Sequence, residues 1–127
     1  LSADVAGYAR LMERDEAGTL AEFRARHSAV IEPLAAQHGG RIVRAMGDGF
    51  LAEFASPMNA VSFAVDMQLA SEARNAPLPA ASRMSFRIGI NLSDVIVALD
   101  DVFGEGVHVA SRLQAAAERV ELVEPRA

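Results

Sequence analysis

The stretch RIVRAMGDGFLAEF, residues 41–54, places an extended apolar run on each side of the sequence Gly47-Asp48-Gly49. Residues 41–46 and 50–54 are each typical of a β-strand, and Asp-Gly between two such runs is among the strongest short signals for a hairpin. A tight type I′ turn accounts for this composition, because its central residues need positive φ. Asp48 is then either a turn residue alone or a carboxylate that the hairpin tip presents to a ligand.

The region before the hairpin predicts a strand and a helix. LSADV, residues 1–5, has the composition of the end of a strand. Residues 15–38 predict a helix in which Thr19 and Glu22 form a capping box at or inside the start, Pro33 causes a kink, and Gly39-Gly40 mark the end. The apolar side chains of this helix fall on one face: Leu20, Phe23, Val30, Ile31 and Leu34.

The region after the hairpin predicts a second helix and further strands. Ser56-Pro57 is typical of an N-cap followed by Pro at the first helical position, and the helix continues to about residue 75. Its inward-facing positions are predicted to be Val61, Ala64, Val65 and Leu69. MSFRIGINL, residues 84–92, alternates strictly and predicts a strand; an extended piece at 95–99 and a helix at about 107–117 follow. Strands mixed with packing helices predict an α/β or α+β sheet with helices on one face.

Composition limits the classes of protein to which the chain can belong. Its 127 residues are enough for one domain, 1–127, with a modest core. The net charge is −5 and all 12 basic residues are Arg, so a nucleic-acid partner is not expected. No apolar run approaches the roughly 20 residues of a membrane span. The chain has no Cys, which excludes thiolate chemistry. Its three His residues lack the spacing of metal ligands. A cytoplasmic setting is the expectation.

Two carboxylates stand at unusual places in this pattern. Asp4 ends the first predicted strand, and Asp48 lies at the hairpin tip. If the first strand pairs beside the hairpin, both side chains emerge at one edge of the sheet. Mg²⁺ is typically held by one or two carboxylates together with substrate phosphates, so such an edge suits this ion. The alternative for Asp4 is an N-cap for the helical turn in VAGYARLM.

Four blocks of the chain carry a family resemblance: LSADVAGYARLMERDEAGTL, GGRIVRAMGDGFLAEF, FRIGINLSDVIV and DDVFGEGVHVASRLQ. In this order and spacing they resemble the class III adenylate/guanylate cyclase catalytic domain, over residues 1 to about 118, and most closely the bacterial homodimeric adenylate cyclases. The resemblance implies an α+β fold, a ferredoxin-like sheet with helices packed on one face. Compared with the family, the domain is expected to be truncated at both ends, and at the C-terminal end it lacks the strands that bring a phosphate-contacting Lys.

The resemblance also implies roles for individual residues. Asp4 and Asp48 match the two aspartates that hold two Mg²⁺ ions, for which Mn²⁺ can substitute, on the triphosphate. Arg44 stands where adenylate cyclases usually have a Lys that contacts the base. Asp101 matches the acidic residue that accepts a hydrogen bond from the adenine amino group.

Two further positions belong to the catalytic step in the family. His108 stands where an Asn usually positions the ribose, and Arg112 matches the arginine that stabilises the transition state. In the family's homodimer one subunit supplies the metal ligands, and the other supplies the base-reading and transition-state residues. The resemblance therefore implies a homodimer with shared active sites.

The implied reaction converts ATP to 3′,5′-cyclic AMP and pyrophosphate, in cyclic-nucleotide signalling. Three features depart from the family: Arg44, His108 and the missing C-terminal segment. They leave open a catalytically weak or silent module that binds nucleotide or dimerises. A plain ferredoxin-like dimerisation domain is a third possibility, but it treats the placing of Asp4, Asp48, Asp101 and Arg112 as coincidence.

Overall fold

The computed structural model describes residues 1–91, 96–98, 101–103 and 120–122. Within these residues a five-stranded sheet has the order β2-β3-β1-β4-β7, and β5 and β6 form a separate two-stranded ladder. The strands are β1 (Ser2–Val5), β2 (Gly40–Met46), β3 (Gly49–Phe54), β4 (Phe86–Ile90), β5 (Ile96–Ala98), β6 (Asp101–Phe103) and β7 (Val120–Leu122). The helices are α1 (Tyr8–Arg14), α2 (Glu16–Arg26), the π-helical turn η1 (His27–Ile31), α3 (Glu32–Gln37), α4 (Pro57–Asn75) and the 3₁₀ turn η2 (Ala80–Ser82).

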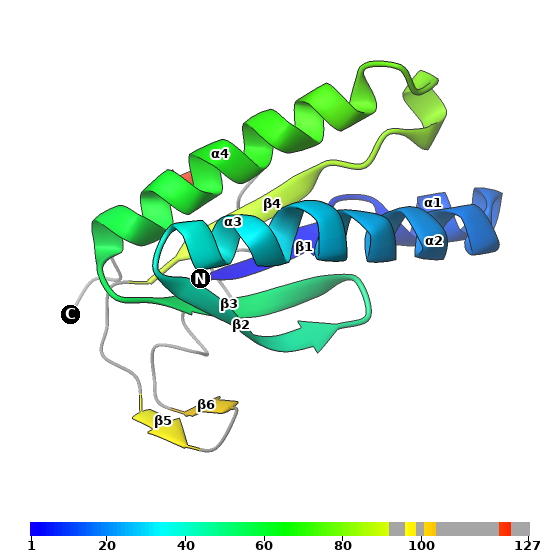
Figure 1. The fold of residues 1–127 in the computed structure, drawn as a ribbon. Coiled ribbons are helices and arrows are strands. Elements are labelled where there is room, and N and C mark those ends of the chain that lie inside the picture. The colour runs from blue at the N-terminus through cyan, green and yellow to red at the C-terminus, as the bar shows by residue number, and fades with distance from the viewer. Residues whose placement is uncertain (92–95, 99–100, 104–119, 123–127) are drawn as a thin grey trace.

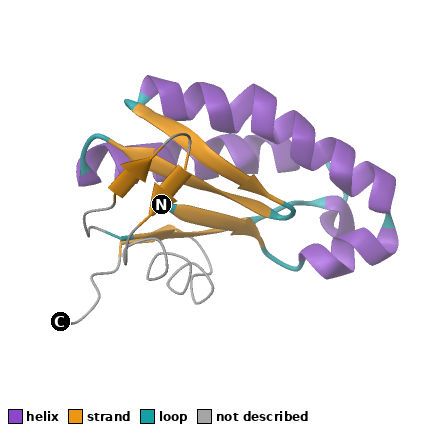
Figure 2. Ribbon diagram, turned by 90° about the horizontal axis from the view of Figure 1, so that it is seen from below, coloured by secondary structure: helices purple, strands orange, loops and turns teal. Residues whose placement is uncertain are grey.

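The first four strands and their helices form a ferredoxin-like unit. β1 pairs antiparallel with both β3 and β4, and β2 pairs antiparallel with β3, so the chain follows a β-α-β-β-α-β path with β1 in the interior of the sheet. The α2–α3 segment and α4 lie side by side over one face of the sheet (Figures 1 and 2). The predicted α+β sheet with helices on one face is confirmed.

The hairpin forms where it was predicted, with a different turn. Met46 and Gly49 are the last paired residues, so Gly47 and Asp48 are the two central turn residues. Among the described glycines only Gly7 and Gly39 have positive φ, so the type I′ prediction is wrong. Gly49 is required for another reason: a Cβ atom there would lie 2.0 Å from the carbonyl oxygen of Ala3 on β1.

The predicted helix over 15–38 is confirmed in extent, but its start and its irregularity lie elsewhere. Asp15 is the N-cap, and its carboxylate accepts a hydrogen bond from the Gly18 N–H at 3.0 Å. The Thr19–Glu22 capping box is therefore wrong; the Thr19 hydroxyl instead donates to the Leu11 carbonyl at 3.0 Å. The helix widens into the π-helical turn η1 just before Pro33, which stands in the first turn of α3. Because Pro has no N–H to donate, the irregularity precedes it.

The core lies between the helices and the sheet, and α4 contributes both small and large side chains to it. Of the four positions predicted to face inward, Ala64 is buried and Val61 packs against the core, whereas Val65 and Leu69 are 43% and 59% exposed and were wrongly predicted. The buried residues of α4 are Ala60, Phe63, Ala64, Met67 and Ser71. Phe63 packs against Phe54 and Phe50 of β3, with ring centroids 4.9 and 6.3 Å apart respectively. No helix in the described part of the chain is long and apolar enough to cross a membrane.

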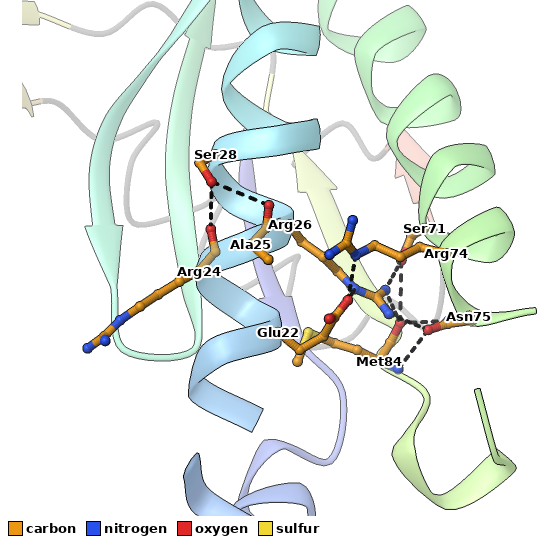
Figure 3. A network of polar contacts seen from close by, with 9 residues as sticks. All are labelled: Glu22, Arg24, Ala25, Arg26, Ser28, Ser71, Arg74, Asn75 and Met84. Atoms are coloured by element: carbon orange, nitrogen blue, oxygen red, sulfur yellow. Dashed lines mark hydrogen bonds and ion pairs between the residues drawn. The ribbon is translucent and has the colours of Figure 1, made fainter. Parts of the chain in front are cut away.

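A buried arginine joins α2 to α4 and to the segment just before β4 (Figure 3). The Arg26 guanidinium, from α2, donates to the Ser71 hydroxyl at 2.7 Å and to the Met84 carbonyl at 3.0 Å. It also donates to the carboxylate of Glu22 at 2.8 Å and to the side-chain oxygen of Asn75. Since Arg26 is only 1% exposed, these hydrogen bonds offset the cost of burying its charge.

Candidate active site

Asp4 lies on the face of the sheet that the helices leave uncovered. Along β1 the buried residues Ala3 and Val5 belong to the core, so alternation directs Asp4 to the opposite face. Asp4 is paired in register with Gly49 of β3 and with Arg87 of β4. The N-cap of α1 is Gly7, with no side-chain cap, which removes the alternative of Asp4 as a helix cap.

A backbone hydrogen bond holds Asp48 next to the end of β1, at the edge of the sheet where Asp4 lies. Its carbonyl accepts a hydrogen bond from the N–H of Val5 at 2.8 Å, one residue beyond Asp4. The close approach of Gly49 to Ala3, which leaves no room for a Cβ atom, holds the hairpin tip against β1. The structure thus brings Asp4 and Asp48 to one edge of the sheet, through two neighbouring antiparallel strands.

Arg87 is the third member of this group, and the sequence reasoning did not select it. Its Nε donates to Asp4 Oδ1 at 2.8 Å and its Nη2 donates to Asp4 Oδ2 at 2.7 Å, so both carboxylate oxygens are engaged by one guanidinium fork. The hydrogen bonding to Asp4 raises the pKa of Arg87; burial opposes this rise, and the charges of Asp4 and Asp48 add to it. Its place in FRIGI, between the core residues Phe86 and Ile88, directs Arg87 away from the core, and the pairing of β4 with β1 brings it opposite Asp4.

This group suits a hard cation. The charges of both aspartates contribute to the raised pKa of the Arg87 guanidinium. Within the described residues no cluster of three or more His, Cys, Asp or Glu side chains could hold a metal, so two carboxylates are what this part offers. Mg²⁺ accepts such a site, because it keeps several waters and takes further oxygen ligands from substrate phosphates.

Arg44 is brought to the same face by an irregularity in β2. The register with β3 shifts between Ile42, which is opposite Ala52, and Arg44, which is opposite Leu51. Without the extra residue, Arg44 would be opposite Phe50 and would point into the core. The bulge therefore directs Arg44, an exposed residue, to the face of the sheet that carries Asp4.

The remaining predicted site residues cannot be placed beside these. Asp101 begins β6, where its backbone pairs with Ala98 of β5, and its side chain is outside the described part. His108 and Arg112 lie outside the described residues. The structure therefore brings together Asp4, Asp48 and the strand that carries Arg44, and it leaves the roles of the other three as predictions.

Comparison with known proteins identifies the family. The sequence profile described as "Adenylate and Guanylate cyclase catalytic domain" matches residues 1–124. The chain belongs to this family. The ferredoxin-like unit and the edge that carries the two aspartates are therefore parts of a cyclase catalytic domain.

Individual relatives agree with this assignment. A Rhizobium meliloti protein named "Putative adenylate cyclase 3" is 47% identical over 118 residues, which are 93% of this chain and 20% of that protein. A Streptomyces coelicolor adenylate cyclase is 31% identical over 92% of this chain and 29% of its own length. The chain thus spans less than a third of either relative.

A solved structure shows the same fold at considerable sequence identity. The adenylate/guanylate cyclase/hydrolase from Silicibacter pomeroyi superposes with a TM-score of 0.83 at 39% identity, over 97% of this chain and 71% of that one. Because the likeness covers 97% of this chain, its fold is that of a cyclase domain.

Proposed function

We propose that the protein is an adenylate cyclase that converts ATP to 3′,5′-cyclic AMP and pyrophosphate. The observation that carries the proposal is the pair of aspartates at one edge of the sheet, joined by the Val5–Asp48 backbone hydrogen bond, in a chain of the cyclase family. The two relatives whose names include adenylate cyclase support ATP as the nucleotide.

The role of Asp4 and Asp48 in this proposal is to hold two Mg²⁺ ions, or Mn²⁺ in their place. The bound ions supply the acidity that activates the ribose 3′-hydroxyl and the positive charge that neutralises the phosphates. The 3′-oxygen forms a bond to the α-phosphorus, and the hydroxyl proton passes to water. The bond between the α-phosphorus and the oxygen that bridges it to the β-phosphate breaks, and pyrophosphate leaves with the electron pair of that bond. No nucleophile from the protein is needed, which agrees with a chain that has no Cys.

The base is assigned to Asp101 and Arg44. An ionised Asp only accepts hydrogen bonds, so it suits the amino group of adenine and repels the carbonyl oxygen of guanine. Arg44 can donate to a ring nitrogen of adenine, although it can also donate to guanine. We therefore expect ATP to be preferred over GTP by about 10-fold or more, because one mispaired buried polar group costs ~1–3 kcal/mol.

The proposed active form is a homodimer in the cytoplasm. Asp101, His108 and Arg112 of one copy complete the site formed by Asp4 and Asp48 of the other. Such an arrangement is isologous, so each dimer carries two equivalent sites. Arg112 would donate to the phosphoryl oxygens as charge develops on them, and His108 would orient the ribose.

The test is to incubate the protein with ATP or GTP and Mg²⁺ or Mn²⁺ and to identify the cyclic product. Cyclic AMP as the main product supports the proposal, and Asp101→Ala should reduce the preference for ATP. Equal use of GTP, or an unchanged preference in the Asp101 variant, would remove Asp101 from base recognition. Binding of both nucleotides without turnover would favour the silent module, which the departures at Arg44 and His108 keep as the second candidate.

A further inference from the structure

The proposed metal site already contains a cation that belongs to the protein. The guanidinium of Arg87 occupies both oxygens of Asp4, with donor–acceptor distances of 2.8 and 2.7 Å. Both side chains are partly exposed, Arg87 at 32% and Asp4 at 16%, so the pair lies at the surface of the edge rather than deep in the core. The inference that follows rests on the proposed function, because it concerns how that site takes up its metal.

Arg87 and a metal ion would bind the same carboxylate of Asp4. A divalent ion bound to Asp4 would stand within a few ångströms of the guanidinium, where two positive charges repel, all the more strongly where water is partly excluded. Asp48 attracts the guanidinium as well, so Arg87 stands in the field of both carboxylates that the metal would use. The metal and the Arg87 fork therefore compete for the same carboxylate.

Without Arg87 the edge would be unfavourable in the metal-free protein. Two carboxylates at one edge repel each other, and a nearby cation offsets this repulsion. The bidentate geometry also fixes the Asp4 side chain, since a guanidinium fork matches a carboxylate in only a few orientations. In the metal-free protein Arg87 is thus placed to neutralise the charge of Asp4, as the metal would do in the metal-bound protein.

We infer that Arg87 is an internal counter-ion for Asp4, which leaves the carboxylate when a divalent ion binds and which lowers the metal affinity of the free protein. Arg87 acts here through Asp4 and is a positioning residue. The fork holds Asp4 ready in the empty site, and its displacement opposes metal binding.

The experiment is a calorimetric titration of the purified protein with Mn²⁺ in the absence of nucleotide. Arg87→Gln should bind Mn²⁺ about 10-fold more tightly than the wild type, because the competing cation is gone while both aspartates remain. Arg87→Lys keeps the positive charge and should stay near the wild-type affinity. Arg41→Gln is the matched control: Arg41 forms the same kind of cross-strand pair, with Glu53, away from the hairpin tip, and its loss should leave the affinity unchanged.

Melting temperature provides the second readout. Without metal, Arg87→Gln should melt below the wild type, because Asp4 has lost the guanidinium that pairs with it. The same concentration of Mn²⁺ should raise the melting temperature of Arg87→Gln by more than that of the wild type, because stabilisation by a ligand increases with the logarithm of its affinity. A merely structural role for Arg87 predicts equal increments in both proteins.

The outcomes separate this inference from the proposed function. If the wild type binds Mn²⁺ and Asp48→Asn does not, but Arg87→Gln binds no more tightly than the wild type, the counter-ion role is overturned and the metal site stands. If wild type, Asp48→Asn and Arg87→Gln all fail to bind Mn²⁺, the metal site itself fails and the inference fails with it.

Discussion

The N–H of Val5 donates to the carbonyl of Asp48 at 2.8 Å, and this hydrogen bond fastens the hairpin tip to the end of β1. The relative position of Asp4 and Asp48 is therefore fixed by backbone geometry, with only the side-chain torsions left to adjust. A site built on strands in this way is held more precisely than one built on loops. Residues that hold the hairpin tip against β1, such as Gly49, should therefore affect the site although they are not part of it.

Substituting Gly49 should separate the two aspartates. In Gly49→Ala the new Cβ atom would lie 2.0 Å from the carbonyl oxygen of Ala3, so β3 must move away from β1. We expect a loss of about 1–3 kcal/mol in the free energy of unfolding, as is typical of overpacking, together with weaker Mn²⁺ binding. Urea denaturation and a Mn²⁺ titration measure the two effects.

Gly47→Ala provides the matched control for this substitution. Gly47 stands two residues away in the same turn, nothing lies within 4 Å of a Cβ atom built there, and its φ is outside the left-handed region. Its unfolding free energy and Mn²⁺ affinity should remain close to those of the wild type. Equal losses in the two variants would show that the turn is generally sensitive and that the contact with Ala3 is not decisive.

Arg26 should be the most sensitive charged residue of the described scaffold. Arg26→Met removes the donor that joins Ser71, Asn75 and the Met84 carbonyl, and these groups are left partly unsatisfied in a buried place. We expect a loss of about 2–4 kcal/mol in unfolding free energy. Arg24 lies two residues earlier on the exposed side of α2, so Arg24→Met should change the unfolding free energy little (Figure 3). Similar denaturation midpoints for both variants would contradict the assigned role of the network.

The carboxylate of Glu22 should make stability depend on pH at the acid end. Burial raises the pKa of Glu22, but hydrogen bonds and charges from Arg74 and Arg26 outweigh it and hold the pKa below the ordinary value of 4.5. A lowered pKa in the folded state contributes stability above pH 4.5, and that contribution is lost as the pH falls through the folded-state pKa.

A pair of Gln variants tests this dependence. Glu22→Gln should be less stable than the wild type by about 1 kcal/mol at pH 7, and the difference should shrink as the pH falls below about 4. Glu13→Gln, at an exposed position of α1, makes the same change of charge and should show a small difference at every pH. Melting temperatures between pH 3 and pH 7 measure both. A gap between Glu22→Gln and the wild type that stays constant over this range would contradict the assignment.

The order of strands and helices could be predicted because it depends on local patterns. The Gly-Asp-Gly turn, the Ser56-Pro57 helix start and the alternation of residues 84–92 each act over a few neighbouring residues. The face of α4 was predicted only in part: Val61 and Ala64 lie toward the core as expected, and Val65 and Leu69 do not. Val65 and Leu69 are large and apolar, but the face of α4 that packs on the sheet is the one that carries Phe63 and Met67 between the small residues Ala60 and Ala64.

The candidate site was only partly predictable for a related reason. Asp4 and Asp48 could be selected because strand ends and hairpin tips are recognisable in sequence. Arg87 could be selected only once β4 was known to lie beside β1, 83 residues away in the chain. The bulge that directs Arg44 to the site is likewise a property of the pairing between β2 and β3, and no residue in RIVRAM signals it.

The most direct measurement is the rate of cyclic AMP formation by Asp4→Asn and Asp48→Asn, compared with the wild type and with Glu72→Gln. Glu72 is exposed on α4, so its substitution removes one negative charge without touching the site. Both Asn variants should lose at least ~100-fold in rate, because several kcal/mol of charge stabilisation go with the metals, while Glu72→Gln keeps the wild-type rate. Wild-type rates in folded Asp4→Asn or Asp48→Asn would contradict the assignment of these two aspartates to the catalytic metals.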